Sequence, residues 1–407
     1  MFEGDTITLL FGSISIAVAI GFLGERLFKR TGIPDVIPIM ILGLLVGPIL
    51  NLINPEPLVA MAPLFGSIAL LIILFNSGLN LDFYAVVKQA PRAAMLAIMT
   101  FGLGTLSTMV IAIYVLKMEP MLGILLGTIL GGSSSIIVIP YLQQMKVGER
   151  VKTILSLEST ITDILAVVAT LTIIKVIQIG ATGSETMPIT QMISSSFSIG
   201  IVTGLLLGLI WLWVFPKISK DAYNYMMTLF IAFLTYSITE FLGGSGPLSA
   251  LVFGLILGNG RSMSQIFKFD KQVTINTDIT RFNSEISFLV RSIFFVYIGI
   301  IATIGDIQLT IVGIGIALLL LSSRLVAAPI VTWKTKIEKQ RNMIIVMFPR
   351  GLGAAVLASL PFTMGIPNTE IFVNVVFVVI FATIAITVAG TFTIKNKKNK
   401  LEDFDTT

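Results

Sequence analysis

The strongest constraint on the fold is a series of hydrophobic runs, most of them about 20 residues long, along almost the whole chain. A run of this length crosses a bilayer as an α-helix, whereas a transmembrane β-strand needs only about ten residues of alternating hydrophobicity. Of the 407 residues, 55% are hydrophobic and only 12% are charged, about half the charged share of a soluble domain. We therefore predict an all-α polytopic membrane protein.

The hydrophobic runs predict about thirteen transmembrane helices. Their approximate positions are about 7–28, 33–53, 60–81, 93–116, 120–144, 152–178, 192–216, 222–242, 245–259, 284–304, 308–332, 342–363 and 371–394.

The positive charges predict how these helices are oriented. Most of the 27 Lys and Arg residues lie in every second connection between the predicted helices. Because positively charged connections stay in the cytoplasm, we predict that the N-terminus is outside and the C-terminus inside. The net charge of +5 follows from this topology and does not indicate nucleic-acid binding.

Two sets of six helices joined by one further helix predict two inverted repeats. Gly43 and Gly47 in the second predicted helix match Gly254 and Gly258 in the ninth, although G-x-x-x-G is also common in ordinary helix packing. We predict a single membrane transport domain over residues 1–407. Its parts are a first repeat (1–178), a linking helix (192–216), a second repeat (222–394) and a short cytoplasmic tail (395–407).

The fifth predicted helix of each half contains residues that interrupt helices. Gly131–Ser135 reads GGSSS, and Pro349–Gly353 reads PRGLG. Unwound segments inside a membrane are tolerated where the freed backbone groups line a cavity or an ion site. Two such segments at corresponding positions of two repeats are typical of a transport site, so we expect crossed broken helices. A pair of simple proline kinks is the alternative.

The sixth predicted helix carries two acids, Glu158 and Asp163, well inside the membrane. A charge at the bilayer centre costs at least about 2.5–3.5 kcal/mol, so such residues are usually paired or functional. Glu158 shares a helix face with Thr162, and Ser159 shares one with Asp163. Carboxylate and hydroxyl oxygens suit Na⁺ or K⁺, and a chain without His or Cys offers no soft ligand for a transition metal.

We expect the two acids to have different roles. Glu158 is predicted to form a structural ion pair with Arg350, and Arg291 and Arg324 are predicted to be supporting charges. Asp163 would then hold either a proton or a cation, never both, which is the minimum requirement for antiport. The alternative is that both acids are structural and each is paired with an arginine.

These residues resemble the monovalent cation:proton antiporter superfamily. Glu158–Asp163, with the sequence ESTITD, is similar to the E-S-x-x-N-D segment of NhaP-type Na⁺/H⁺ exchangers, and Arg350-Gly351 resembles their late R-G motif. Ser133–Leu142 is more similar to the Kef and NapA-like branch. Phe75–Asp82 resembles an F-x-x-G-L-x-x-D element found in both branches.

The resemblance implies a secondary antiporter, not an enzyme, that exchanges Na⁺ or K⁺ for H⁺ by alternating access without a cofactor. Asp163 would take the ion or proton, Ser159 would contribute a ligand, and the break in the fifth helix would add Ser134 and Ser133. Thr162 stands where the family has Asn, Asp or Gln, and it leaves the choice between Na⁺ and K⁺ open. With one titrating acid we predict electroneutral exchange.

The resemblance also implies a homodimer and a core of the fourth to sixth and eleventh to thirteenth helices, which moves against a panel that includes the first, second, eighth and ninth. The composition is compatible with the plasma (inner) membrane of an archaeon or bacterium. The residues leave open a Na⁺-coupled organic anion carrier on a similar scaffold. In that carrier Arg350 and Arg291 would bind the anion.

Overall fold

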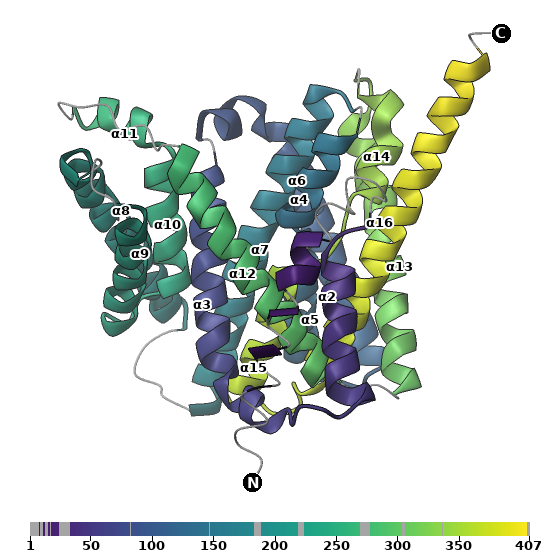
Figure 1. The fold of residues 1–407 in the computed structure, drawn as a ribbon, viewed down its shortest axis with the longest axis horizontal. Helices are drawn as coiled ribbons and strands as arrows, with labels where there is room; N and C mark the ends of the chain where they lie inside the picture. Colours follow the sequence, from purple (N-terminus) through teal and green to yellow (C-terminus); the bar gives the residue numbers. More distant parts are fainter. Residues whose placement is uncertain are drawn as a thin grey trace. The chain divides into compact units, whose positions relative to one another are not determined.

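The computed structural model of the chain describes most of its residues. These are 8, 11–12, 15–16, 18–23, 33–81, 83–145, 147–182, 189–218, 224–268, 277–302, 306–335 and 337–404. Every regular element in these ranges is a helix (Figure 1). Much of the first predicted helix and Asp82 lie outside the described residues, and those residues of the helix that are described are helical.

The described helices follow the hydrophobic runs. They are α2 (Val36–Leu44), the π-helical turn η1 (Leu45–Ile49), α3 (Glu56–Asn80), α4 (Phe83–Tyr114), α5 (Pro120–Gly131), α6 (Ser135–Gln144), α7 (Glu149–Thr182), α8 (Ile189–Ile218), α9 (Asn224–Phe241), α10 (Gly246–Gly258), α11 (Gly260–Ile266), α12 (Thr277–Ile301), α13 (Ile307–Thr332), the 3₁₀ turn η2 (Glu338–Gln340), α14 (Arg341–Val346), α15 (Leu352–Thr363) and α16 (Ile371–Phe404).

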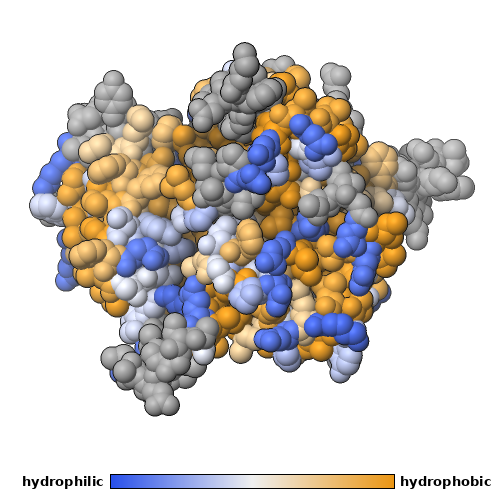
Figure 2. Space-filling model, turned by 90° about the horizontal axis from the view of Figure 1, so that it is seen from below, coloured by the Kyte–Doolittle hydropathy of each residue, from blue (hydrophilic) through white to orange (hydrophobic). Residues whose placement is uncertain are grey.

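Eight candidate spans in the described part of the chain are long and apolar enough to cross a membrane, and four further apolar helices are shorter. Large hydrophobic side chains are exposed on many of these helices, including Phe230, Ile311 and Leu318. The face seen in Figure 2 shows wide orange hydrophobic areas interrupted by blue hydrophilic side chains. Such a surface suits a lipid environment. The count of thirteen helices stays a prediction.

The chain forms two compact units. The first comprises Met1–Pro63, Gln89–Ile173 and Ser292–Thr407, and the second comprises Leu64–Lys88 and Ile174–Arg291. The first unit contains the predicted core helices, but it also contains α2, which we had expected in a separate panel. The reason is close packing. A Cβ at Gly43 would lie 2.8 Å from the Gly299 Cα of α12, so the two backbones are in direct contact.

In the second unit, α10 packs against α8 and α9 (Figure 1). It also contacts α3, because a Cβ at Gly258 would lie 2.8 Å from the Leu79 carbonyl carbon. The Phe75 and Phe253 rings meet beside this contact with their centroids 5.7 Å apart. The glycines of the matching G-x-x-x-G segments therefore mark close helix crossings in both units.

Both predicted helix interruptions are present, and both lie in the first unit. Gly132 and Ser134 have extended backbone angles and separate α5 from α6. Residues 347–351 separate α14 from α15. Pro349 has no N–H, and its ring disfavours a continuous helix, whereas glycines weaken helices through their backbone entropy. The interruptions come from this local chemistry and not from Pro361, through which α15 continues.

Candidate functional site

The two interrupted helices meet at their unwound segments. The Ser134 backbone N–H donates to the Pro349 carbonyl at 2.8 Å. Gly351 packs directly on Ser134, because a Cβ at position 351 would lie 2.6 Å from the Ser134 Cβ. Each break therefore supplies a hydrogen-bond partner or packing surface to the other, as unwound backbone inside a membrane requires.

A threonine from a neighbouring long helix binds a freed backbone N–H in each break. Thr162 Oγ1 of α7 accepts from the Ser133 N–H at 3.1 Å, and Thr383 Oγ1 of α16 accepts from the Arg350 N–H at 3.1 Å. Thr162 also donates to the Ser159 carbonyl at 3.1 Å and is fully buried. Its hydroxyl, which we predicted to bind the cation, is thus engaged in holding the first break.

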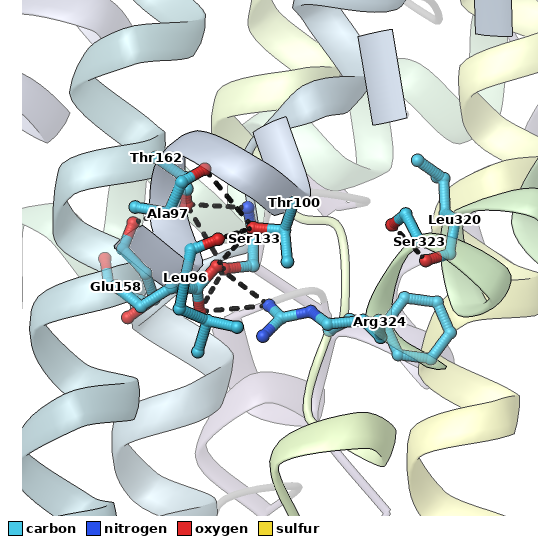
Figure 3. Close-up of polar contacts among 12 residues, drawn as sticks. Leu96, Ala97, Thr100, Ser133, Glu158, Thr162, Leu320, Ser323 and Arg324 are labelled. Carbon is cyan, nitrogen blue, oxygen red and sulfur yellow. Dashed lines mark hydrogen bonds and ion pairs between the residues drawn. The ribbon is translucent and has the colours of Figure 1, made fainter. Parts of the chain in front are cut away.

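Glu158 is fully buried and surrounded by donors (Figure 3). Arg324 Nη2 donates to both carboxylate oxygens, at 2.9 and 3.0 Å. Ser133 Oγ lies 3.2 Å from each oxygen, and Thr100 Oγ1 of α4 lies 3.3 Å from Oε1. Burial of a charge requires such compensation, so the pair ties together α4, α7, α13 and the first break.

The predicted pair between Glu158 and Arg350 is corrected by this geometry, because the ion pair is made by Arg324. Arg324 projects from the continuous helix α13, opposite Glu158 (Figure 3). Arg350 is also buried, but its Nη1 donates to the Phe348 carbonyl at 3.1 Å, just beyond the end of α14. Arg350 therefore satisfies a backbone carbonyl that the second break leaves outside a helix.

Asp163 has different surroundings, since it is partly exposed. Its Oδ2 accepts from Ser135 twice, from the hydroxyl at 2.7 Å and from the backbone N–H at 3.2 Å. Its Oδ1 faces α15, because a Cβ at Gly353 would lie 3.8 Å from it. Ser135 begins α6 and Gly353 is the second residue of α15, so the carboxylate lies beside the N-terminal, positive ends of two half-helices.

The remaining predicted site residues are placed as follows. Ser159 is buried one helical turn before Asp163, and its hydroxyl donates to the Ser156 carbonyl at 3.1 Å. Ser134 is buried against Gly351. Arg291 belongs to the second unit, where its guanidinium carbon lies 5.4 Å from the centre of the Phe288 ring.

Two residues at the site were missed by the sequence analysis. Ser135 is the third serine of the GGSSS segment, so the segment pointed to it, but the choice among three adjacent serines needs the backbone conformation. Thr100 is a single threonine in an apolar helix and carries no sequence signal. It reaches Glu158 across 58 residues of chain.

The described residues contain no cluster of three or more His, Cys, Asp or Glu side chains that could hold a metal ion. Instead, the site offers one partly exposed carboxylate with hydroxyl and backbone groups around it. That set of hard oxygen donors suits a proton or a monovalent cation.

Replacement of Gly351 with alanine is expected to lower the transport rate about 100-fold, because the new methyl group must push the two breaks apart and displacements of about 1 Å have effects of this size. The initial rate in proteoliposomes measures it. Gly102→Ala is the matched control, since a Cβ at Gly102 meets nothing within 4 Å. Wild-type transport by Gly351→Ala would contradict the direct contact between the breaks.

Comparisons with known proteins identify the family and the fold of the chain. Residues 14–395 match the sequence model of the family described as "Sodium/hydrogen exchanger, transmembrane". The solved structure of the sodium proton antiporter MjNhaP1 from Methanocaldococcus jannaschii at pH 8 has the same fold, with a TM-score of 0.75. The likeness covers 95% of this chain and 97% of that chain, at 21% identity.

Curated relatives are similar over most of the chain. A K⁺/H⁺ antiporter, NhaP2 of Shewanella oneidensis, is 25% identical over 399 residues, which cover 94% of this chain and 66% of the relative. The "Probable Na(+)/H(+) antiporter 2" of Methanocaldococcus jannaschii is 26% identical over 372 residues, covering 88% of this chain and 85% of the relative. The chain thus spans slightly less than two thirds of the bacterial relative. Because the family model matches nearly the whole chain, the protein belongs to the sodium/hydrogen exchanger family of monovalent cation:proton antiporters.

Proposed function

We propose that the protein exchanges Na⁺ or K⁺ for H⁺ across the plasma (inner) membrane of an archaeon or bacterium, with Asp163 as the carboxylate that both ions share. The contrast between the two acids carries this proposal. Glu158 is buried, and both of its oxygens bind Arg324, so it has a structural role. Asp163 is partly exposed, and its Oδ1 has no hydrogen-bond donor among the described residues.

The charges of the site favour electroneutral exchange. Glu158 and Arg324 form a buried ion pair, so their two charges cancel. Asp163 gains the same single charge whether it binds a proton or a monovalent cation, so both loaded states of the site carry equal charge. Exchange of one such state for the other, one proton per cation, moves no net charge across the membrane.

Two structural correspondences support the two inverted repeats, on which the alternating access depends. Helix α2, the second predicted helix, crosses α12, the tenth, at Gly43, and α10, the ninth, crosses α3, the third, at Gly258. Thr162 and Thr383 support the two breaks in the same way. In the first observation, the second and third helices correspond to the ninth and tenth. In the other, the sixth helix, with Thr162, corresponds to the thirteenth, with Thr383. In this proposal, Asp163 is exposed to the two sides of the membrane in turn.

The test is cation-driven proton movement in proteoliposomes that contain the purified protein and a pH-sensitive dye inside. After a proton gradient is imposed, addition of Na⁺ or K⁺ is expected to dissipate it, and the active ion names the substrate. To test for electroneutral exchange, the Na⁺ response is repeated with K⁺ and valinomycin holding the voltage at zero, and we expect the rate to be unchanged. A rate that rises severalfold under the voltage clamp would contradict one-for-one exchange.

The comparisons favour this function over the organic anion carrier, since the named relatives are K⁺/H⁺ or Na⁺/H⁺ antiporters. The structure adds a second argument against the carrier, because Arg350 is turned to the Phe348 carbonyl. If no cation dissipates the proton gradient, Na⁺-stimulated uptake of carboxylates is the next experiment. The homodimer stays a prediction, which the mass of the detergent-solubilised protein tests.

A further inference from the structure

The three consecutive serines at the first break have three different partners. Ser133 donates to Glu158, the buried acid of the ion pair. Ser134 joins the break to the second break through its backbone N–H. Ser135 donates to Asp163. A shift of one residue in the break would therefore take away the partner that each carboxylate has in the structure.

The contact between Ser135 and Asp163 is directed at one carboxylate oxygen. Both the hydroxyl, at 2.7 Å, and the backbone N–H, at 3.2 Å, donate to Oδ2. An oxygen that accepts two hydrogen bonds would lose part of this stabilisation if it carried a proton itself. The charged groups that act on Asp163 are Glu158 and Arg350. Oδ1 faces Gly353, where a Cβ would meet no described atom within 4 Å except Oδ1 itself, at 3.8 Å. The two oxygens are therefore not equivalent.

We propose that Ser135 is a positioning residue that sets the competition between proton and cation at Asp163, by holding Oδ2 and leaving Oδ1 as the oxygen that exchanges the two ions. This inference rests on the proposed function, because it assigns the balance between the two ions to a particular hydroxyl group. Ser135 acts through the carboxylate and does not itself bind the cation.

The consequence is a pH-dependent affinity for the cation. The Ser135 hydroxyl stabilises the ionised carboxylate more than the protonated one, and a hydrogen bond to a charged group is worth roughly tenfold in an equilibrium. Without this hydroxyl, protons compete better, so the apparent KM for the cation rises wherever protons occupy the site. At alkaline pH, where Asp163 is ionised in both proteins, the difference disappears.

The experiment measures the apparent KM for the transported cation in proteoliposomes at pH values between about 6 and 10. This range compares conditions in which protons compete for the site with conditions in which they do not. For Ser135→Ala we expect a KM raised roughly tenfold at the acidic end, convergence with the wild type at the alkaline end, and a pH profile moved by about one unit. Ser135→Thr keeps the hydroxyl and is expected to retain the wild-type profile.

Ser359→Ala is the matched control. Ser359 lies in α15, in the other interrupted helix, is also buried, and donates to the Val356 carbonyl of its own helix at 2.8 Å. Its removal is expected to leave KM and the pH profile unchanged. If Ser135→Ala does not yield folded protein, Ser135→Cys replaces it, because a thiol is a weak donor and predicts a smaller shift of the same sign.

Two results would overturn the inference. A KM that stays raised at every pH would make Ser135 a direct cation ligand, and an unchanged KM at every pH would deny it any role at Asp163. Failure of the proposed function looks different, because the wild-type protein itself would then show no cation-driven proton movement.

Discussion

Replacement of Asp163 with asparagine is expected to reduce cation-driven proton movement to the rate of protein-free liposomes. An amide neither ionises nor takes up a proton near neutral pH, so it cannot alternate between the two ions. The protein is expected to fold, because the asparagine oxygen can still accept the hydrogen bonds from Ser135 and the side chain is partly exposed. The measurements are proton flux in proteoliposomes and size-exclusion chromatography of the purified variant.

Asp306→Asn is the matched control for this substitution. Asp306 is the exposed N-cap of α13, where its Oδ1 accepts from the Leu309 N–H at 3.1 Å, and asparagine caps helices about as well as aspartate. Its transport is expected to equal that of the wild type. Retained exchange in Asp163→Asn would exclude Asp163 as the carboxylate shared by the two ions.

Removal of one member of the buried pair is expected to have the largest effect on stability. Glu158→Gln leaves the Arg324 guanidinium, which is 1% exposed, without a counter-charge. Breaking a buried pair from one side costs about 3–5 kcal/mol, because the remaining charge stays desolvated. We expect a clear fall in the thermal unfolding temperature of the detergent-solubilised protein. The single variant Arg324→Met is expected to be destabilised in the same way.

The double variant identifies the partner of Glu158. Glu158→Gln with Arg324→Met removes both charges together, so we expect it to be more stable than either single variant, with a coupling energy of about 0.5–3 kcal/mol. Glu158→Gln with Arg350→Met is the matched comparison, and it should show no such recovery, because Arg350 binds the Phe348 carbonyl. Recovery with Arg350→Met and not with Arg324→Met would contradict the pairing seen in the structure.

Much of the architecture follows from local sequence patterns. Lengths of the hydrophobic runs predict membrane-spanning helices, because a helix must match the bilayer thickness. The GGSSS and PRGLG segments predict the two interruptions, because glycine and proline act on the backbone wherever they stand. Glu158 and Asp163 stand out because a charge deep in the bilayer is costly, and their depth follows from their position within a hydrophobic run.

The placement of α2 in one compact unit with the predicted core helices could not be read from the sequence. A G-x-x-x-G segment indicates that a helix packs closely against another, but it does not say against which one. In the structure the glycines at 43 and 47 meet α12, and those at 254 and 258 meet α3. The grouping of helices is therefore a property of the packed chain.

The sequence by itself determined the class of protein, the two breaks and the two acids of the sixth predicted helix, because each of these depends on residues close together in the chain. The tertiary structure alone decided the partners. Arg324 binds Glu158 across 166 residues, and Ser135, not Ser134, donates to Asp163 across 28. Hydrogen bonds depend on distances of a few tenths of an ångström and on direction. Only the packed helices fix both for groups so far apart in the sequence.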